Sequence, residues 1–290
     1  MKLSHNKAIL LMVVVALLWS TAGVVTRHLE VVRSFEVTFW RSLFALLTLL
    51  FLLPLISGKQ VFTKLRHATL PFWLSGVCWS IMFTAYMLAL TMTSVGNVLV
   101  MLAIGPLLTA LVARAFIGHR VPWRTWMAIV VAGMGIYYMF ASQMATGSVA
   151  GTLVALCVPV AGAINWTVTQ RSHDHGHAVD LMPAVFVGAL ISVLITLPMA
   201  YPLQANAHDI ALLGLLGSCQ LAIPCILCVV CARVLKAPEM SLLALLEVIF
   251  GILLAWLGAN EVPTQAALTG GALVVGALVA NELIAWRQRG

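Results

Sequence analysis

Ionisable side chains inside long apolar runs are the residues of this sequence best placed to do chemistry. Glu247 lies within the apolar run Met240–Leu257, near its middle. A charged group in hydrocarbon costs several kcal/mol unless it meets a partner or a water-filled cavity. Glu247 could therefore bind the ammonium group of a ligand or carry a coupled proton. The structural interpretation is a protonated or hydrogen-bonded packing residue.

Arg41 is the second buried charge, and it stands about two helical turns into the apolar run Ser34–Ile56. Its guanidinium could neutralise the carboxylate of a ligand. A structural tie to backbone carbonyl groups or to Glu247 explains the residue equally simply and is the interpretation we favour at this point.

Indole and amide side chains recur at related places in the two halves of the chain. Trp79 and Gln220 are 141 residues apart. Aromatic faces and amides can hold an amino-acid-like molecule by stacking and hydrogen bonding. The same side chains can also anchor a helix near lipid headgroups or join two helices. The other candidates of this kind are Trp19, which pairs loosely with Asn165 and Trp166, and Asn97.

Two clusters have the residue types of metal ligands. Cys225, Cys228 and Cys231 form a C-x2-C-x2-C run inside an apolar stretch, and His173, His175 and His177 stand in a polar linker. Iron–sulfur ligands normally lie on loops with a fourth thiolate, so we expect apolar packing for the cysteines and a solvated linker for the histidines. The sequence also lacks a phosphate-binding loop and a catalytic-triad or zinc-helix motif. We expect no metal, no cofactor and no enzymatic activity.

The composition places these residues in a membrane protein. Of the 290 residues, 62% are hydrophobic and only 9% are charged, which excludes a soluble enzyme. No polar block is long enough to fold as a separate domain. The net charge of +7 comes from Lys and Arg scattered between apolar runs, so nucleic acid is not an expected partner.

The apolar runs predict ten transmembrane helices of about 20 residues each. Residues 68–113 and 125–170 each run 46 residues without a charge or a histidine, so each should hold two spans, with turns at Thr91–Ser94 and Ser142–Gly151. Single spans are expected at Ala8–Thr26, Ser34–Ile56, Leu181–Tyr201, Ile210–Ala232, Met240–Leu257 and Thr264–Ala285.

The positive charges predict the orientation of these spans. With the N-terminus in the cytoplasm, thirteen of the sixteen Lys and Arg residues lie on the cytoplasmic side, Arg27 and Arg33 lie outside, and Arg41 lies within a span. Positive loops tend to stay in the cytoplasm. Both termini are therefore expected there, with the lipid bilayer as partner and the bacterial inner membrane as location.

The second half of the sequence repeats the first. Ala115-Phe116-Ile117-Gly118 followed by Val121-Pro122 returns as Ala255-Trp256-Leu257-Gly258 followed by Val262-Pro263. We expect five-helix repeats at residues 1–145 and 146–290. Because five is odd, the second repeat would enter the membrane inverted, and inverted halves can rock around a central site. Pro106, whose span ends at the repeated glycine, is the predicted hinge.

These segments resemble the EamA-type ten-helix carriers of the drug/metabolite transporter superfamily over essentially the whole chain. The matching pieces are Leu18–Thr21, Phe39–Arg41, Ala89-Leu90 with Gly96 and Pro106, Gly118 with Val121-Pro122, and Leu246-Glu247 with Trp256–Gly258. His119 and Ala259-Asn260-Glu261 depart from the family pattern, which usually has Glu directly after each glycine.

The resemblance implies an all-α membrane protein that carries small metabolites, most often exporting amino acids or related compounds. An importer on the same scaffold, a membrane-embedded enzyme or a structural subunit remain the alternatives. The substrate, the coupling ion and the oligomeric state stay open.

Overall fold

The computed structural model describes residues 4–31, 34–58, 61–62, 69–117, 123–144, 149–174, 181–235 and 237–287. These residues form helices and no strands. The helices of the first half are α1 His5–Thr26, α2 Ser34–Ser57, α3 Leu70–Met92, α4 Val95–Leu102, α5 Gly105–Ile117 and α6 Trp123–Met144. Those of the second half are α7 Val149–Asp174, α8 Met182–Ala200, α9 Ala207–Leu215, η3 Leu216–Ala222, α10 Ile223–Cys231, α11 Ala237–Ala244, α12 Leu246–Ala259 and α13 Gln265–Arg287.

Seven segments of the described chain are long and apolar enough to cross a membrane. They are His5–Thr26, Phe35–Ser57, Leu70–Met92, Val95–Phe116, Val149–Ser172, Met182–Ala200 and Ala207–Cys231. Three shorter apolar segments, Trp126–Gly135, Leu246–Ala259 and Leu268–Ala277, lie in the remaining long helical stretches. The prediction of a membrane-embedded helical protein is confirmed, while the count of ten crossings stays a prediction.

Two of the helical rods are interrupted near their middle. The first breaks between α4 and α5, where Ile104 N–H bonds the carbonyl of Met101 in a tighter turn. Pro106 follows, and because proline has no N–H it cannot donate to the carbonyl of Leu102. The second break, between α11 and α12, falls at Leu245, where Val248 N–H bonds the Leu245 carbonyl. The two interruptions lie 141 residues apart, which is the offset of the sequence repeat.

A third rod contains a π-helical segment. Between α9 and α10, η3 covers Leu216–Ala222, and Ile223 N–H bonds the carbonyl of Ser218, five residues back. Pro224 cannot donate to the carbonyl of Gln220, which removes one α-helical bond from this turn. Such π segments inside α-helices often lie at functional sites.

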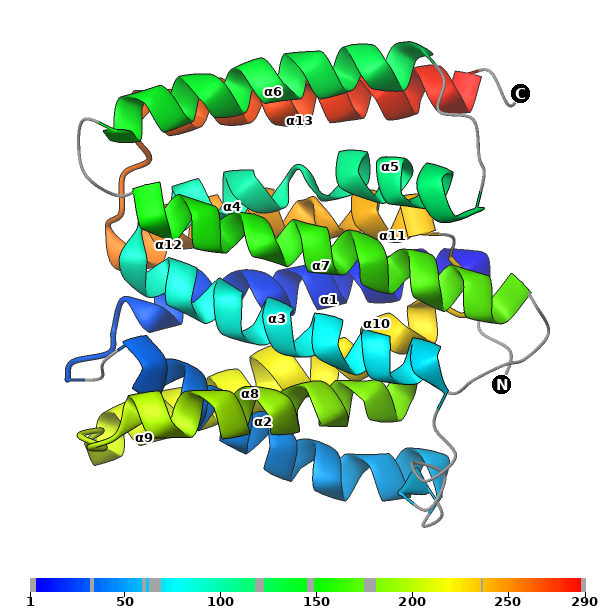
Figure 1. Cartoon of the computed structure of the whole chain (residues 1–290). Helices are drawn as coiled ribbons and strands as arrows, with labels where there is room; N and C mark the ends of the chain where they lie inside the picture. The colour runs from blue at the N-terminus through cyan, green and yellow to red at the C-terminus, as the bar shows by residue number, and fades with distance from the viewer. Residues whose placement is uncertain are drawn as a thin grey trace.

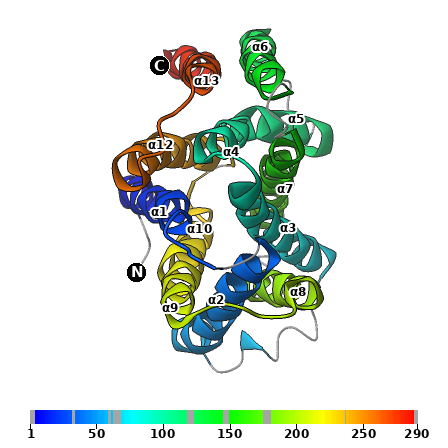
Figure 2. The ribbon, with the colours of Figure 1, turned by 90° about the vertical axis from the view of Figure 1, so that its left-hand side faces the viewer.

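The helices run roughly along one axis, and α6 and α13 form a pair at one side of the bundle (Figures 1 and 2). The helices of one half pack mainly on helices of the other: α3 on α7 and α8, and α9 with η3 on α2. Similarly α5 packs on α7 and α12 packs on α1. Helix α1 begins and α13 ends at the same end of the bundle (Figure 1).

Glycines allow the closest of these approaches. A Cβ at Gly76 of α3 would lie 2.9 Å from Val187 Cγ1 of α8, and a Cβ at Gly217 of η3 would lie 2.5 Å from the carbonyl oxygen of Arg41 in α2. Small residues let backbones come close where helices cross in a membrane. Gly76 and Gly217 are also 141 residues apart, so related positions serve related contacts.

Candidate functional site

A cavity of about 130 Å³ lies among α1, α2, α3, α4, α5, α7, η3, α10 and the α11–α12 junction. Its walls come from both halves of the chain. Seven of the nine residues singled out in the sequence line it: Trp19, Arg41, Trp79, Pro106, Trp166, Gln220 and Glu247. Asn97 and Asn165 do not.

Arg41 reaches the cavity from α2 and is buried. Its Nε and Nη2 donate to Oε1 of Gln220 at 3.1 and 2.8 Å, and Nη1 donates to the carbonyl of Phe83 at 3.4 Å. The guanidinium carbon lies 5.8 Å from the ring centre of Tyr86. The structural tie expected for Arg41 is therefore present, but it runs to neutral groups and not to Glu247.

Glu247 is in the first turn of α12, immediately after the interruption at Leu245. Its Oε1 accepts a hydrogen bond of 3.1 Å from the hydroxyl of Tyr86 on α3, and its side chain is buried. Within the part of the chain that the structure describes, no Lys, Arg or His nitrogen lies within 4.0 Å of this carboxylate.

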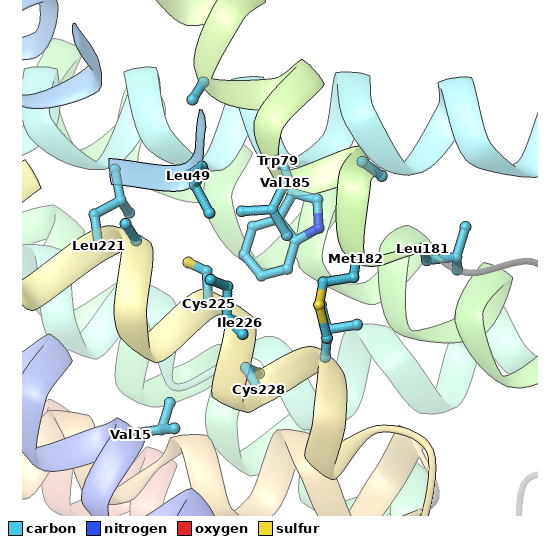
Figure 3. Packing of buried hydrophobic residues seen from close by; sticks show 14 of the residues in the cluster. Val15, Leu49, Trp79, Leu181, Met182, Val185, Leu221, Cys225, Ile226 and Cys228 are labelled. Carbon is cyan, nitrogen blue, oxygen red and sulfur yellow. The ribbon is translucent and has the colours of Figure 1, made fainter. Parts of the chain in front are cut away.

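Aromatic rings of α3 and α7 also line the cavity. The rings of Trp79 and Trp166 meet edge to face, with centroids 5.7 Å apart and an interplanar angle of 85°. Phe83 lies 5.5 Å from Trp79 by the same measure. This geometry suits the π systems of aromatic pairs and leaves apolar faces toward the cavity. Trp79 also belongs to the buried cluster that α8 and α10 complete with Val185 and Cys225 (Figure 3).

The two interrupted rods contact each other at the cavity, where Pro106 also lies. Thr109 Oγ1 of α5 and Ser241 Oγ of α11 are 2.9 Å apart in a buried hydrogen bond, and both line the cavity. Helix interruptions free backbone groups that can serve a site when they line a cavity. The hinge assigned to Pro106 stays a prediction, although the residue does lie at an interruption.

The two asparagines make structural contacts of different kinds. Asn165 Oδ1 accepts from Ser75 Oγ at 2.7 Å, which joins α7 to α3. Asn97 Nδ2 donates to Thr93 Oγ1 at 3.1 Å, a local contact in the turn between α3 and α4. The helix-joining interpretation therefore fits Asn165.

Tyr86, Phe83, Met82, Thr109 and Ser241 line the cavity although the sequence alone did not indicate them. Tyr86 is seven residues after Trp79 and so shares a face of α3 with it. That spacing could have identified Tyr86, but tyrosine and phenylalanine are inconspicuous in an apolar run.

The cysteine run considered as a metal-ligand motif lies inside α10. Cys225, Cys228 and Cys231 are buried free thiols, and the residues that the structure describes hold no group of three metal-ligating side chains. Cys225 lines the cavity, and Figure 3 shows Cys225 and Cys228 among apolar side chains. His175, His177, Gly118 and His119 lie outside the described residues, as does the side chain of His173.

A polar network ties four elements together at one end of the bundle. Arg27, directly after α1, donates to Glu261 at 2.7 Å and to the carbonyls of Leu90 and Thr93 at 2.8 and 2.9 Å. Glu261 also accepts from the backbone N–H of Val95 at 2.7 Å. Asn260 ends α12 in a left-handed conformation with φ of 52°, and Glu261 follows it directly. Glu261, which stands three residues after Gly258 and not directly after it, thus makes structural contacts with Arg27 and Val95.

Residues 6–141 match the EamA-like transporter family. Over 266 residues the chain is 24% identical to an S-adenosylmethionine uptake transporter of Rickettsia conorii, covering 88% of this chain and 85% of that protein. It is 23% identical over 186 residues to the uncharacterized transporter YdfC of Bacillus subtilis, covering 63% of this chain and 61% of that one. A solved crystal structure has the same fold, with a TM-score of 0.70 over 97% of this chain and 99% of the other at 19% identity.

Proposed function

We propose that this chain, which matches the EamA-like transporter family over residues 6–141, is a member of the drug/metabolite transporter superfamily and a secondary transporter of a small polar or amphipathic metabolite. The observation that carries the proposal is the cavity lined by both halves of the chain, where a buried cation, Arg41 of α2, and a buried carboxylate, Glu247 beside the α11–α12 interruption, both line the wall. Charged residues inside a membrane protein are retained at substrate and ion pathways.

Alternating access between two inverted five-helix repeats, residues 1–145 and 146–290, is the proposed mechanism. The matched interruptions at Ile104 and Leu245 and the matched close approaches at Gly76 and Gly217 support a pseudo-twofold relation. In such carriers interrupted helices surround the substrate at mid-depth, and the halves move around it. Ten spans with both termini in the cytoplasm of a bacterium complete the proposal.

The proposed substrates are amino acids or related compounds, moved out of the cytoplasm. Opposite charges at Arg41 and Glu247 and aromatic faces at Trp79 and Trp166 suit a molecule with polar and apolar parts. A volume of about 130 Å³ is below the roughly 300 Å³ at which ligand pockets usually begin, so the cavity must widen to admit a larger cargo.

Import is the second candidate. The Rickettsia conorii relative is named for the uptake of S-adenosylmethionine, a compound that has an amino-acid end. The direction of a secondary carrier depends on gradients and coupling, and Glu247 is the residue we propose to carry a proton if coupling exists.

The test is a flux screen with purified protein in proteoliposomes. The panel contains radiolabelled amino acids, S-adenosylmethionine and related metabolites, each assayed with and without a pH gradient. We expect saturable flux of at least one compound above that of empty liposomes. If nothing in the panel crosses, and cells lacking the chain keep normal metabolite levels but lose a reaction product, the enzyme alternative replaces the proposal.

A further inference from the structure

We propose that Arg41 selects the transported molecule by binding its anionic group, and that Gln220 is the residue that positions Arg41 for this task. The inference rests on the proposed function only in taking the cavity as the substrate site. It assigns a carboxylate or a similarly sized anion to one defined wall of that cavity.

The guanidinium of Arg41 has N–H donors that form no hydrogen bond within the part of the protein that the structure describes. A guanidinium carries five N–H groups in a planar fork. Three hydrogen bonds are formed, two to Oε1 of Gln220 and a longer one to the carbonyl of Phe83. Two N–H groups of the terminal nitrogens therefore remain for a ligand, at a residue that lines the cavity. Paired N–H groups on one plane match the two oxygens of a carboxylate.

The charge of Arg41 is also uncompensated by direct contact. Only 2% of the residue is exposed, and no carboxylate of the described residues lies within 4.0 Å of it. Glu247 is engaged by the Tyr86 hydroxyl instead. The Tyr86 ring offers a cation–π contact, which is weaker than the cost of burying an ion. An anionic ligand would supply the missing opposite charge.

Gln220 holds the guanidinium in place through its carbonyl oxygen. Its Oε1 accepts both bonds from Arg41, and its Nε2 donates to the carbonyl of Trp19 at 3.1 Å. The amide thus links α1, α2 and η3. Gln220 lies in the π-helical segment η3. The direction of its side chain therefore differs from the direction it would have in a regular α-helix.

The first experiment compares two isosteric probes on the full-length protein in detergent. Acetate and acetamide are titrated at constant ionic strength, and binding is followed by tryptophan fluorescence, because Trp19, Trp79 and Trp166 line the cavity. We expect a saturable response to acetate and a response to acetamide at least about tenfold weaker. In Arg41→Gln the acetate affinity should fall about tenfold or more, as expected when a charge-assisted hydrogen bond is lost.

Arg114→Gln is the matched control, because Arg114 is an exposed arginine near the end of α5 and lies outside the cavity lining. It should bind acetate as the unaltered protein does. If Arg41→Gln does not fold, Arg41→Lys keeps the charge and loses the fork, so its acetate affinity should still fall. Equal binding of acetate by the Arg41 variants and the unaltered protein would overturn the inference.

Gln220→Glu tests the positioning role. The new carboxylate can keep both hydrogen bonds to Arg41 while neutralising it, so α2 and η3 stay tied and the anion site is occupied from within. The bond to the Trp19 carbonyl in α1 is lost, because a carboxylate has no N–H. We expect a folded protein with acetate binding reduced about tenfold or more and acetamide binding unchanged. A purely structural role for the pair would leave acetate binding intact. If the variant does not fold, Gln220→Asn withdraws the acceptor by one methylene, and it should weaken acetate binding for lack of positioning.

Flux measurements separate this inference from the proposed function. Acetate binding that depends on Arg41, together with no flux of any compound in the panel, would remove the transport proposal and keep the anion site. Equal flux of a carboxylate substrate and of its carboxamide, with the same ratio in Arg41→Lys, would keep transport and remove the selective role of Arg41.

Discussion

Glu247 is the carboxylate that stands at the turn between two helix segments, and its replacement by Gln tests whether its charge is used. Gln keeps the size and can still accept the Tyr86 hydroxyl bond. We expect insertion and folding to be unchanged and transport, or at least its dependence on pH, to be lost. The groups that face Glu247 across the cavity are Tyr86 from α3, Arg41 from α2 and Cys225 from α10.

The measurement is proteoliposome flux between pH 5.5 and 8.5, with Glu30→Gln as control because Glu30 is exposed and lies outside the cavity lining. The control should retain the full pH profile. Unaltered flux of the Glu247 variant at every pH would remove this residue from the mechanism.

Cys225 provides a natural reporter of cavity occupancy. It lines the cavity, whereas Cys228, one turn further along the same stripe of α10, is buried in the apolar cluster. In variants that keep only one of these two cysteines, a small thiol reagent should modify Cys225 faster, and a transported compound should slow that reaction severalfold. Cys228 should not respond. Indifference of Cys225 to every transported compound would count against the cavity as the binding site.

The residues found from the sequence were those that are polar or indole-bearing inside apolar runs. Trp79 and Gln220 could be selected because the repeat places them at one offset, and both line the cavity. Tyr86 was missed because its hydroxyl is hidden in an aromatic side chain that an apolar run tolerates. The sequence could not show that Asn165 contacts another helix and not a ligand. Its partner Ser75 is 90 residues away, and only the fold brings the two side chains together.

At the scale of elements, helix ranges were predictable because the bilayer sets one length for every span. The interruption at Pro106 was indicated by the proline. The one at Leu245 and the π segment at Leu216–Ala222 were not, because neither has a residue at the break itself that excludes an α-helical turn. Tertiary packing and the downstream Pro224 explain the π segment only after the fact.

The contact of Gly217 in η3 with α2 supports a stability prediction. A side chain there would meet the Arg41 carbonyl and Phe44 Cβ, so Gly217→Val should lower the free energy of unfolding by about 1–3 kcal/mol through overpacking. The measurement is the thermal midpoint in detergent. Gly133→Ala on exposed α6, where a Cβ would meet nothing within 4 Å, is the control and should be neutral or slightly stabilising.

The ion pair of Arg27 and Glu261 joins α1 to the segment after α12 at the end that the proposed orientation places outside the cell. Opening the cavity to that side would have to separate α1, α3 and α4 from this segment, so Glu261→Gln should favour the open form. Such partly exposed pairs contribute up to about 1 kcal/mol. The population of the open form should therefore rise about two- to fivefold.

The rate at which an impermeant thiol reagent added outside modifies Cys225 measures this opening. The control is again Glu30→Gln, because the Glu30 carboxylate accepts a hydrogen bond from Asn206 and is not part of the Arg27–Glu261 network. A Glu261 variant that reacts at the unaltered rate would show that this network does not restrain opening.

At the scale of the whole molecule, the packing pattern is the one expected if the proposed repeats face each other. Helices of the first half of the chain pack on helices of the second: α3 lies on α8 as η3 lies on α2. The pairing of α6 with α13 and of α2 with α8 joins equivalent helices across the proposed axis. A cavity at this junction is therefore bounded by both halves, and relative movement of the halves would change its access.

An odd number of crossings in each half has a consequence that can be checked without a substrate. If each half crosses five times, ten crossings return the chain to the side on which it began, and the thirteen Lys and Arg of the predicted cytoplasmic side keep it there. Epitope tags at the N- and C-terminus should both be protected from protease in intact cells and cleaved after permeabilisation. A tag placed between residues 201 and 206, in the connection between α8 and α9, should be accessible from outside and serves as the positive control. Cleavage of one terminal tag in intact cells would require an odd number of crossings, and the inverted relation between the halves would then fail with it.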